Sequence, residues 1–347
     1  MQYFTGSYIF TIVGVLLAYF WGEHIQHGAG LLSVFIVLIL SILEISLSFD
    51  NAVVNASKLA KMNKKWERIF LTWGILIAVF GMRFLFPVLV VSLFAKISLI
   101  SVIHIAMSNA HLYAHYLHLT HAPIVTFGGM FLSMLFFSYF FNSKKELHWI
   151  KPIEHKMKVL GNIKGAETIL SLIMLLVLAH RFPISEKSGI LVSGLFGITI
   201  YLLIDGISHW LENKEEKFEK SSKAIKDTGL ISFLYLELID ASFSLDGVLG
   251  AFALSHDIII ITIGLSIGAM FVRSLTVMIV EKKTLNKYIY LEHGAHWAIG
   301  ALALIMLVSS MREVPELVTG LTGLFFIITS LISSIRQNKK EQDGESA

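Results

Sequence analysis

Long apolar stretches separated by short polar loops run along the whole chain. Several reach the roughly 20 residues that an α-helix needs to cross the core of a bilayer. Ten such stretches are present, at about residues 8–22, 30–56, 69–94, 121–141, 167–181, 188–210, 229–255, 258–280, 291–311 and 315–335. The pattern therefore predicts an all-α polytopic membrane protein with about ten transmembrane helices.

The composition supports this class. The chain is 55% hydrophobic and 15% charged, whereas a soluble domain carries about 25% charged residues. It contains no cysteine, which excludes disulfides and thiolate metal sites. A bound metal would therefore have to take oxygen or imidazole ligands.

Lysine and arginine are distributed unevenly between the two sets of loops. If the N-terminus is cytoplasmic, inner loops and tail hold 22 of the 28 basic residues and outer loops hold four. Cytoplasmic loops retain positive charge, so both termini are expected in the cytoplasm. The histidine-rich segment 97–120 is expected to lie as a helix on the outer surface.

These features divide the chain into two halves. Residues 1–211 form the first half with spans one to six, and 229–336 form the second. A charged cytoplasmic linker, 212–228, separates them, and a polar tail, 337–347, is expected to be disordered.

An internal repeat relates spans two to four (30–141) to spans seven to nine (229–311). The matched residues are Glu44, Ser46, Ser48 and Asp50 with Asp240, Ser242, Ser244 and Asp246; Gly74 and Arg83 with Gly264 and Arg273; and Tyr113, His118 and His121 with Tyr288, His293 and His296. Five spans separate the copies, so the second would run opposite to the first. Inverted repeats with a site at their interface are a transporter architecture.

The repeated carboxylates lie within apolar spans, where each charge costs at least about 2.5–3.5 kcal/mol. Such groups usually serve function, although protonated carboxylates that only join helices are the structural alternative. Successive helical residues advance by about 100°, so Glu44 and Asp50 would face one ion only if the helix is broken or unwound between them. The predicted metal ligands are Glu44, Asp50, Asp240 and Asp246, with Ser48, Ser244 and Asn51.

Further polar residues accompany this site. Arg83 and Arg273 are predicted counter-ions, which would leave the four repeated carboxylates with a net charge of about −2. Glu237 is either an accessory carboxylate or part of an inner entrance. The remaining candidates are histidines at i, i+3 spacing, either a metal or proton relay or simply caps of spans: His118, His121, His293 and His296.

At these residues the chain resembles the TerC family of bacterial membrane proteins. That family carries a Glu-x5-Asp-Asn segment and a later Asp-x5-Asp segment, here Glu44 to Asn51 and Asp240 to Asp246. The resemblance implies a transporter of the LysE-like superfamily in a bacterial inner membrane. It would export divalent metal, manganese above all, with a link to tellurium resistance. The chain departs from the pattern by an insertion between Arg83 and His118 and by its many histidines.

The expected function is therefore secondary export of a divalent cation, with the metal as substrate and no prosthetic group. Carboxylates, hydroxyls and carbonyls suit Mn²⁺, Mg²⁺ or Ca²⁺, and no P-loop is present. Partners are the metal ion and the lipid bilayer, with a possible homo-oligomer and no nucleic acid. An enzyme is not expected, but an intramembrane metal-dependent enzyme and a membrane scaffold for metal or tellurite stress remain alternatives.

Overall fold

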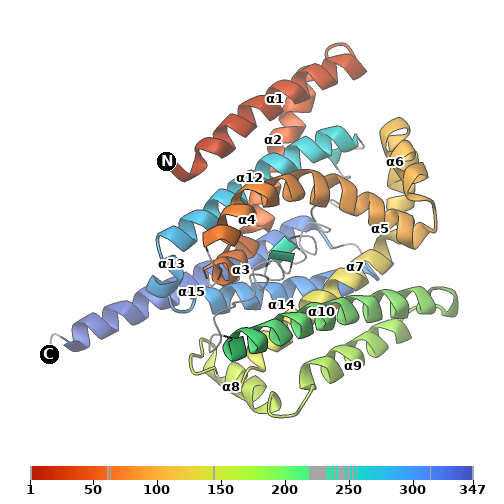
Figure 1. Ribbon diagram of the computed structural model, residues 1–347. Helices are drawn as coiled ribbons and strands as arrows, with labels where there is room; N and C mark the ends of the chain where they lie inside the picture. The colour runs from red at the N-terminus through yellow and green to blue at the C-terminus, as the bar shows by residue number, and fades with distance from the viewer. Residues whose placement is uncertain are drawn as a thin grey trace.

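The computed structural model describes most of the chain in three-dimensional detail (Figure 1). The described residues are 2–60, 62, 64–143, 145–218, 233, 234, 236, 237, 240, 247, 251, 254, 255, 257–312 and 314–345. Every regular element within these ranges is helical, as the apolar pattern predicts.

The helices follow one another with short connections. The first half contains η1 (Gln2–Phe4), α1 (Thr5–Ile25), α2 (Gly30–Leu47), α3 (Phe49–Leu59), α4 (Lys64–Leu76), the π-helix η2 (Ile77–Leu85), α5 (Phe86–Ala95), α6 (Leu99–Ser108), α7 (Ala110–Phe140), α8 (Lys151–Leu160), α9 (Ala166–His180) and α10 (Ile184–Phe218). The second half contains α12 (Ile258–Glu281), α13 (Thr284–Lys287), α14 (Leu291–Ser309) and α15 (Glu316–Glu345).

Seven helices within the described residues are long and apolar enough to cross a membrane. They lie in α1, α2, α7, α10, α12, α14 and α15 and match seven of the ten predicted spans. The predicted third span is a helical stretch in three parts, α4, η2 and α5, and the fifth is α9, with 15 residues. Most of the seventh, 229–255, lies outside the described residues.

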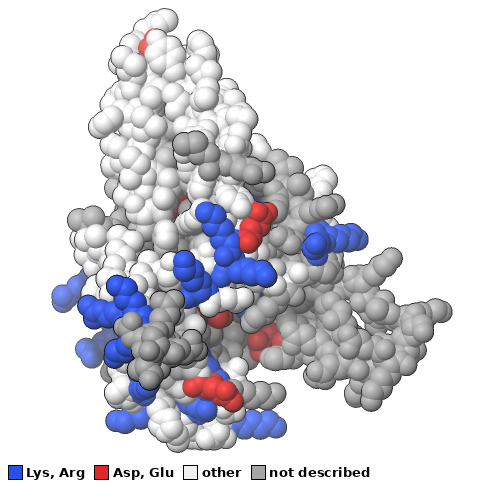
Figure 2. Space-filling model, turned by 90° about the vertical axis from the view of Figure 1, so that its left-hand side faces the viewer, with Lys and Arg blue, Asp and Glu red and all other residues white. Residues whose placement is uncertain are grey.

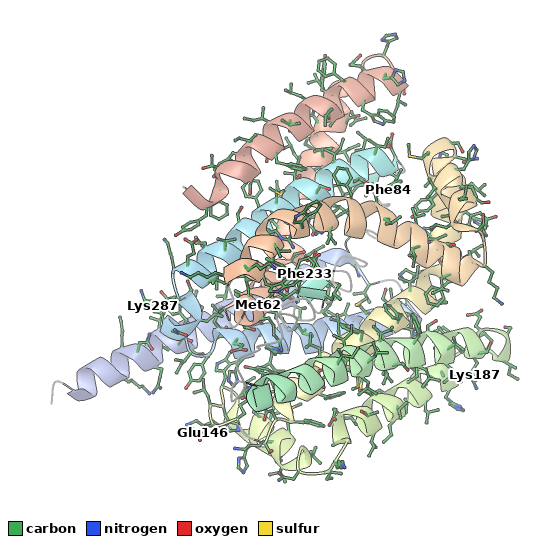
Figure 3. The ribbon with its side chains drawn as sticks, viewed as in Figure 1. Met62, Phe84, Glu146, Lys187, Phe233 and Lys287 are labelled. Atoms are coloured by element: carbon green, nitrogen blue, oxygen red, sulfur yellow. The ribbon has the colours of Figure 1, made fainter. Side chains whose placement is uncertain are left out.

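The loops assigned to the two sides of the membrane lie at opposite ends of the molecule. Both chain ends, α8 and α13 lie at one end in Figure 1, and α6 lies at the other. In Figure 3, Lys287 and Glu146 are at the first end, and Lys187 is at the second. Figure 2 shows the first end face-on, with Lys and Arg gathered over its lower part and few charges near α1.

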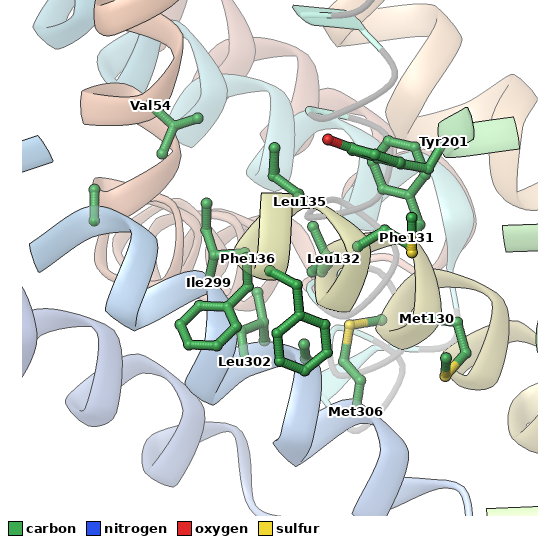
Figure 4. Packing of buried hydrophobic residues seen from close by; sticks show 14 of the residues in the cluster. Val54, Met130, Phe131, Leu132, Leu135, Phe136, Tyr201, Ile299, Leu302 and Met306 are labelled. Carbon is green, nitrogen blue, oxygen red and sulfur yellow. The ribbon is translucent and has the colours of Figure 1, made fainter. Parts of the chain in front are cut away.

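The centre of the fold is α7, which packs against both α10 and α14. Phe131, Leu135 and Phe136 of α7 meet Ile299 and Met306 of α14 in one buried cluster (Figure 4). Inside a bilayer no hydrophobic driving force holds helices together, so they associate through close van der Waals packing. Small residues allow this because they let the helices approach closely. Gly129 illustrates this, since a Cβ there would lie 3.2 Å from the carbonyl oxygen of Ala303.

Two expectations about local structure need correction. The segment 97–120 is not one surface helix: α6 ends at Ser108, and Asn109 then caps α7, whose first turns include residues 110–120. At the other end of the chain, α15 continues through Glu345, where the sequence predicts disorder from residue 337. Gln, Lys and Glu are good helix formers, so the polar composition of this tail is compatible with a helix.

Candidate functional site

The junction of α2 and α3 positions the first copy of the acidic segment. Ser48 separates the helices with non-helical dihedral angles (φ −103°, ψ 17°), so a break does lie between Glu44 and Asp50. The break is only one residue long. Backbone hydrogen bonds continue across it, from Ser48 N to Glu44 O (3.0 Å) and from Ala52 N to Ser48 O (3.2 Å), so the longer unwound segment is not formed here.

Arg83, from the π-helix η2, connects the two halves of the chain. One guanidinium nitrogen, Nη2, donates to Glu44 Oε1, and Nη1 donates to Asp240 Oδ2 at 3.3 Å. Ser48 Oγ donates to Glu44 Oε1 at 3.1 Å, and Asn51 Nδ2 donates to Asp240 Oδ1 at 2.6 Å. All five residues are buried. We call Glu44, Ser48, Asn51, Arg83 and Asp240 the Arg83 network.

The second intramembrane arginine has a different partner. Arg273 Nη2 donates to Glu237 Oε1 at 3.1 Å, and its guanidinium lies 4.1 Å from the ring centroid of Phe70. Gly74 provides space for this pair, since a Cβ there would lie 2.7 Å from both Glu237 Oε1 and Arg273 Nη1. The sequence analysis predicts Arg273 as a counter-ion of the four repeated carboxylates. In the structure Arg273 instead pairs with Glu237, which is not one of these four.

Corresponding positions of the two predicted copies make corresponding contacts. Glu237 borders Gly74, as described above. Ser41 lies three residues before Glu44, as Glu237 lies three residues before Asp240, so Ser41 is the counterpart of Glu237, and Gly264 is that of Gly74. Ser41 Oγ donates to the carbonyl oxygen of Gly264 at 3.0 Å. Each acidic segment is therefore preceded by a residue that contacts the matching glycine of the opposite half.

Asp50 does not join the Arg83 network. Its Oδ1 accepts a hydrogen bond from Asn51 N at 3.0 Å. Its Oδ2 faces α15, where a Cβ on Gly323 would lie 3.6 Å away. The prediction that Asp50 and Glu44 point to one place is not met within the described residues, and Asp246 and Ser244 lie outside them.

The described site is strongly acidic. Glu44, Asp50, Glu237 and Asp240 are all buried. Three of them pair with the two buried arginines, so the formal charge of these six residues is −2 if all are ionised. Buried charges require partners because desolvation is costly. In the described part of the chain, no group of three or more His, Asp or Glu is arranged to hold a metal ion. The guanidinium of Arg83 lies between Glu44 and Asp240 instead.

The predicted histidine pairs are in different surroundings. His118 is exposed on α7, whereas His293 and His296 are buried in the first turns of α14. His296 stacks on Tyr139, with ring centroids 3.4 Å apart. His293 Nδ1 donates to Glu154 at 2.9 Å. The contacts of His293 and His296 described here are thus with this second cluster and not with the Arg83 network.

Glu154, which the sequence analysis missed, is the centre of that second cluster. It lies in α8 between the ends of two spans and accepts four hydrogen bonds, from Trp149 N (2.9 Å), Ile150 N (3.2 Å), His293 Nδ1 (2.9 Å) and Trp297 Nε1 (2.9 Å). We call these five residues the Glu154 network. The sequence feature that could have identified Glu154 is that it is the one acidic residue in the lysine-rich segment Lys151–Leu160.

The surroundings of Glu154 determine its charge. Burial alone would raise its pKa, but the hydrogen bonds from His293, Trp297 and the backbone outweigh burial and lower the pKa to about 2. Nearby, burial lowers the pKa of Lys145 to about 7, and its Nζ lies 3.3 Å from the ring centroid of Tyr139. Glu154 is therefore a fixed anion at neutral pH.

Comparisons with known proteins agree with the membrane character of the fold. The family described as "Protein of unknown function (DUF475)" matches residues 49–341. The "Uncharacterized membrane protein YceF" of Bacillus subtilis (strain 168) is 28% identical over 224 residues, which cover 54% of this chain and 86% of that protein. No solved structure matches significantly. The chain is thus a multi-pass membrane protein, and it belongs to the DUF475 family.

Proposed function

We propose that the protein is a secondary transporter that exports a divalent metal cation, Mn²⁺ above all. The observation that carries this proposal is the position of Arg83. Its guanidinium bridges Glu44 in the first half and Asp240 in the second, inside a buried site with Asn51 as neighbour. A tethered cation thus lies where a transported cation would bind.

The charges support exchange of one cation for another. Glu44 and Asp240 carry two negative charges, and Arg83 compensates one of them. A divalent cation would compensate both and would take carboxylate and amide oxygens as ligands, which hard cations prefer. Binding would therefore displace the guanidinium, and departure of the metal would let Arg83 return. The arginine keeps the empty site from holding two unpaired buried carboxylates.

Two further features support the transporter class. The matching contacts Ser41–Gly264 and Glu237–Gly74 are those expected if spans two to four and seven to nine form inverted repeats around a common site. The resemblance of the acidic segments to the TerC family favours manganese and the direction of export. The excess of Lys and Arg on one set of loops favours cytoplasmic termini, and the membrane protein of Bacillus subtilis to which the chain is similar favours a bacterial membrane.

The ligands are proposed to have unequal roles. Glu44, Asp240 and Asn51 bind the cation in the position now held by Arg83, with Ser48 orienting Glu44. Asp50, whose carboxylate faces α15, would bind the ion only after a side-chain rotation. Asp246 and Ser244 remain predicted ligands from the second copy.

Flux measurements on the purified protein in liposomes test this function directly. We expect Mn²⁺ transport by the wild type and transport at the background level for Glu44→Gln and Asp240→Asn, because each substitution removes one of the two charges that bind the cation. Glu186→Gln is the matched control, since Glu186 is exposed in the first turn of α10. It should transport like the wild type.

The outcome also separates the alternatives. An intramembrane enzyme or a scaffold would give no protein-dependent flux of Mn²⁺, Mg²⁺ or Ca²⁺ in liposomes. Wild-type flux in both site variants, at equal amounts of folded protein, would show that the Arg83 network is not the transport site.

A further inference from the structure

A basic cavity lies beside α8, away from the Arg83 network. It has a volume of about 690 Å³, and its lining includes His148, Lys151, His155, Lys156 and Tyr290. Glu146 is the one acid in the lining. The cavity lies between the end of α7 at Phe140 and the start of α14 at Leu291. Since both helices are long enough to cross a membrane, this position is at the level of the bilayer surface.

The polar groups of the cavity have few protein partners. Lys151 and Lys156 are exposed and form no ion pair with any described residue. His148 Nδ1 donates to the carbonyl oxygen of Glu146 at 2.8 Å, which leaves Nε2 as the free ring nitrogen. Among the described residues nothing hydrogen-bonds this Nε2, although the atom is buried. This nitrogen can donate to an anionic ligand when it carries a proton.

The Glu154 network makes the cavity a preformed feature. Glu154 fastens α8 to the neighbouring backbone at Trp149 and Ile150 and to α14 through His293 and Trp297. Because Glu154 points inward, Lys151, His155 and Lys156 on the same helix remain on the outside, and Tyr290 continues the wall from α14. An anion would therefore meet cationic groups on a helix that is already anchored.

Apolar residues beside the cavity indicate which anion it accepts. Leu147, in its lining, is 39% exposed, and Ile153 and Leu160 of α8 are 48% and 46% exposed. A soluble phosphate would gain nothing from these side chains, but the acyl chains of a lipid would cover them. Basic pockets at the cytoplasmic ends of transmembrane helices are suited to anionic lipid headgroups, and amphipathic helices lie in the same interface.

We propose that this cavity binds the headgroup phosphate of an anionic phospholipid. Lys151, Lys156, His148 and His155 contact the phosphate, and the exposed apolar residues of α8 contact the acyl region. Each basic side chain near a membrane surface strengthens binding of anionic lipid by about fivefold. Removing both lysines should therefore weaken binding by roughly 25-fold.

Native mass spectrometry of the full-length protein in detergent tests this site. The probes are phosphatidylglycerol and phosphatidylcholine with identical acyl chains. The variants are Lys151→Gln with Lys156→Gln, and the control Lys339→Gln with Lys340→Gln, which removes the same charge from exposed positions in α15. We expect the wild type and the control to retain phosphatidylglycerol preferentially. The α8 variant should bind it roughly 25-fold more weakly.

Three results would overturn the proposal. Equal retention of the two lipids by the wild type would show that the headgroup charge is not recognised. An equal loss in both double variants would show a diffuse electrostatic effect rather than a site. Displacement of the lipid by excess inorganic phosphate would show that the cavity selects a soluble anion. Unchanged binding in the presence of phosphate supports the lipid.

Discussion

Two buried carboxylates, Glu44 and Glu154, have opposite kinds of partner. All four hydrogen bonds to Glu154 come from groups fixed by the fold: two backbone N–H groups, an indole and an imidazole. Glu44 is bound by the Ser48 hydroxyl and by a guanidinium at the end of a long side chain. The partners of Glu154 are therefore fixed by the fold, whereas the main partner of Glu44 is carried on a long, flexible side chain.

On the proposed function, this difference separates a structural carboxylate, Glu154, from a cation-exchanging one, Glu44. A carboxylate whose lone pairs are satisfied by fixed donors is stable as an anion without any cation and has no need to bind one. A carboxylate that depends on a flexible cation can exchange that cation for another. Burial and apolar surroundings are common to both residues, so the partners, and not the burial, distinguish the two roles.

The largest effect is expected for Arg83→Ala. Removing the guanidinium leaves Glu44 and Asp240 buried without their shared cation, which should cost about 3–5 kcal/mol of stability. Added Mn²⁺ should stabilise this variant more than the wild type, because it no longer has to displace an arginine. Thermal unfolding with and without Mn²⁺ measures both effects. Equal metal-dependent shifts in the two proteins would contradict the exchange of Arg83 for metal.

Glu154→Ala should be the reverse case. It leaves the indole of Trp297, the imidazole of His293 and two backbone N–H groups without their acceptor, which should cost about 3–4 kcal/mol. Transport per folded molecule should stay close to the wild-type level, since Glu154 is not part of the Arg83 network. Unfolding curves combined with flux at matched amounts of folded protein check this. Wild-type stability would show that the network does not anchor α8.

Lowering the pH should reveal the contribution of Glu154 to stability without a mutation. The pKa of Glu154 is lowered to about 2 from a usual value of about 4.3 in an unfolded chain. A depressed pKa contributes stability that is complete above the unfolded value and is lost as the pH falls towards 2. We expect a loss on the order of 2 kcal/mol between about pH 4.5 and pH 2. This loss should be smaller in Glu154→Ala than in the wild type.

A smaller effect is expected where α12 passes Glu44. A Cβ on Gly268 would contact the Glu44 side chain and lie 2.8 Å from the carbonyl oxygen of Ser41. Gly268→Ala should therefore push α2 away from α12, at a cost of about 1–2 kcal/mol, and should slow transport by displacing Glu44. Gly206→Ala is the control, because no atom lies within 4 Å of its added Cβ. Equal flux in both variants would argue against a close fit around Glu44.

The sequence predicted the class of fold and the meeting of Glu44, Arg83 and Asp240, because apolar length and buried charge follow directly from residue type. It did not predict that Asp50 faces α15, since the helix that covers each face is decided by tertiary packing. The pairing of Arg273 with Glu237 was missed because Glu237 has no acidic counterpart in the first copy. Glu154 escaped notice because its partners His293 and Trp297 are 139 and 143 residues away.

In the proposed exchange, the π-helix η2 would provide the means by which Arg83 leaves its partners. A π turn contains more residues than an α turn, and each residue of an α-helix corresponds to about 100° of rotation. If the extra residue of one π turn in η2 were taken up by α-helical winding, the helix on one side of that turn would rotate by about 100° relative to the helix on the other side. Arg83 lies near the C-terminal end of η2, so a change of winding within a single helix could turn the guanidinium away from Glu44 while the surrounding bundle stays in place.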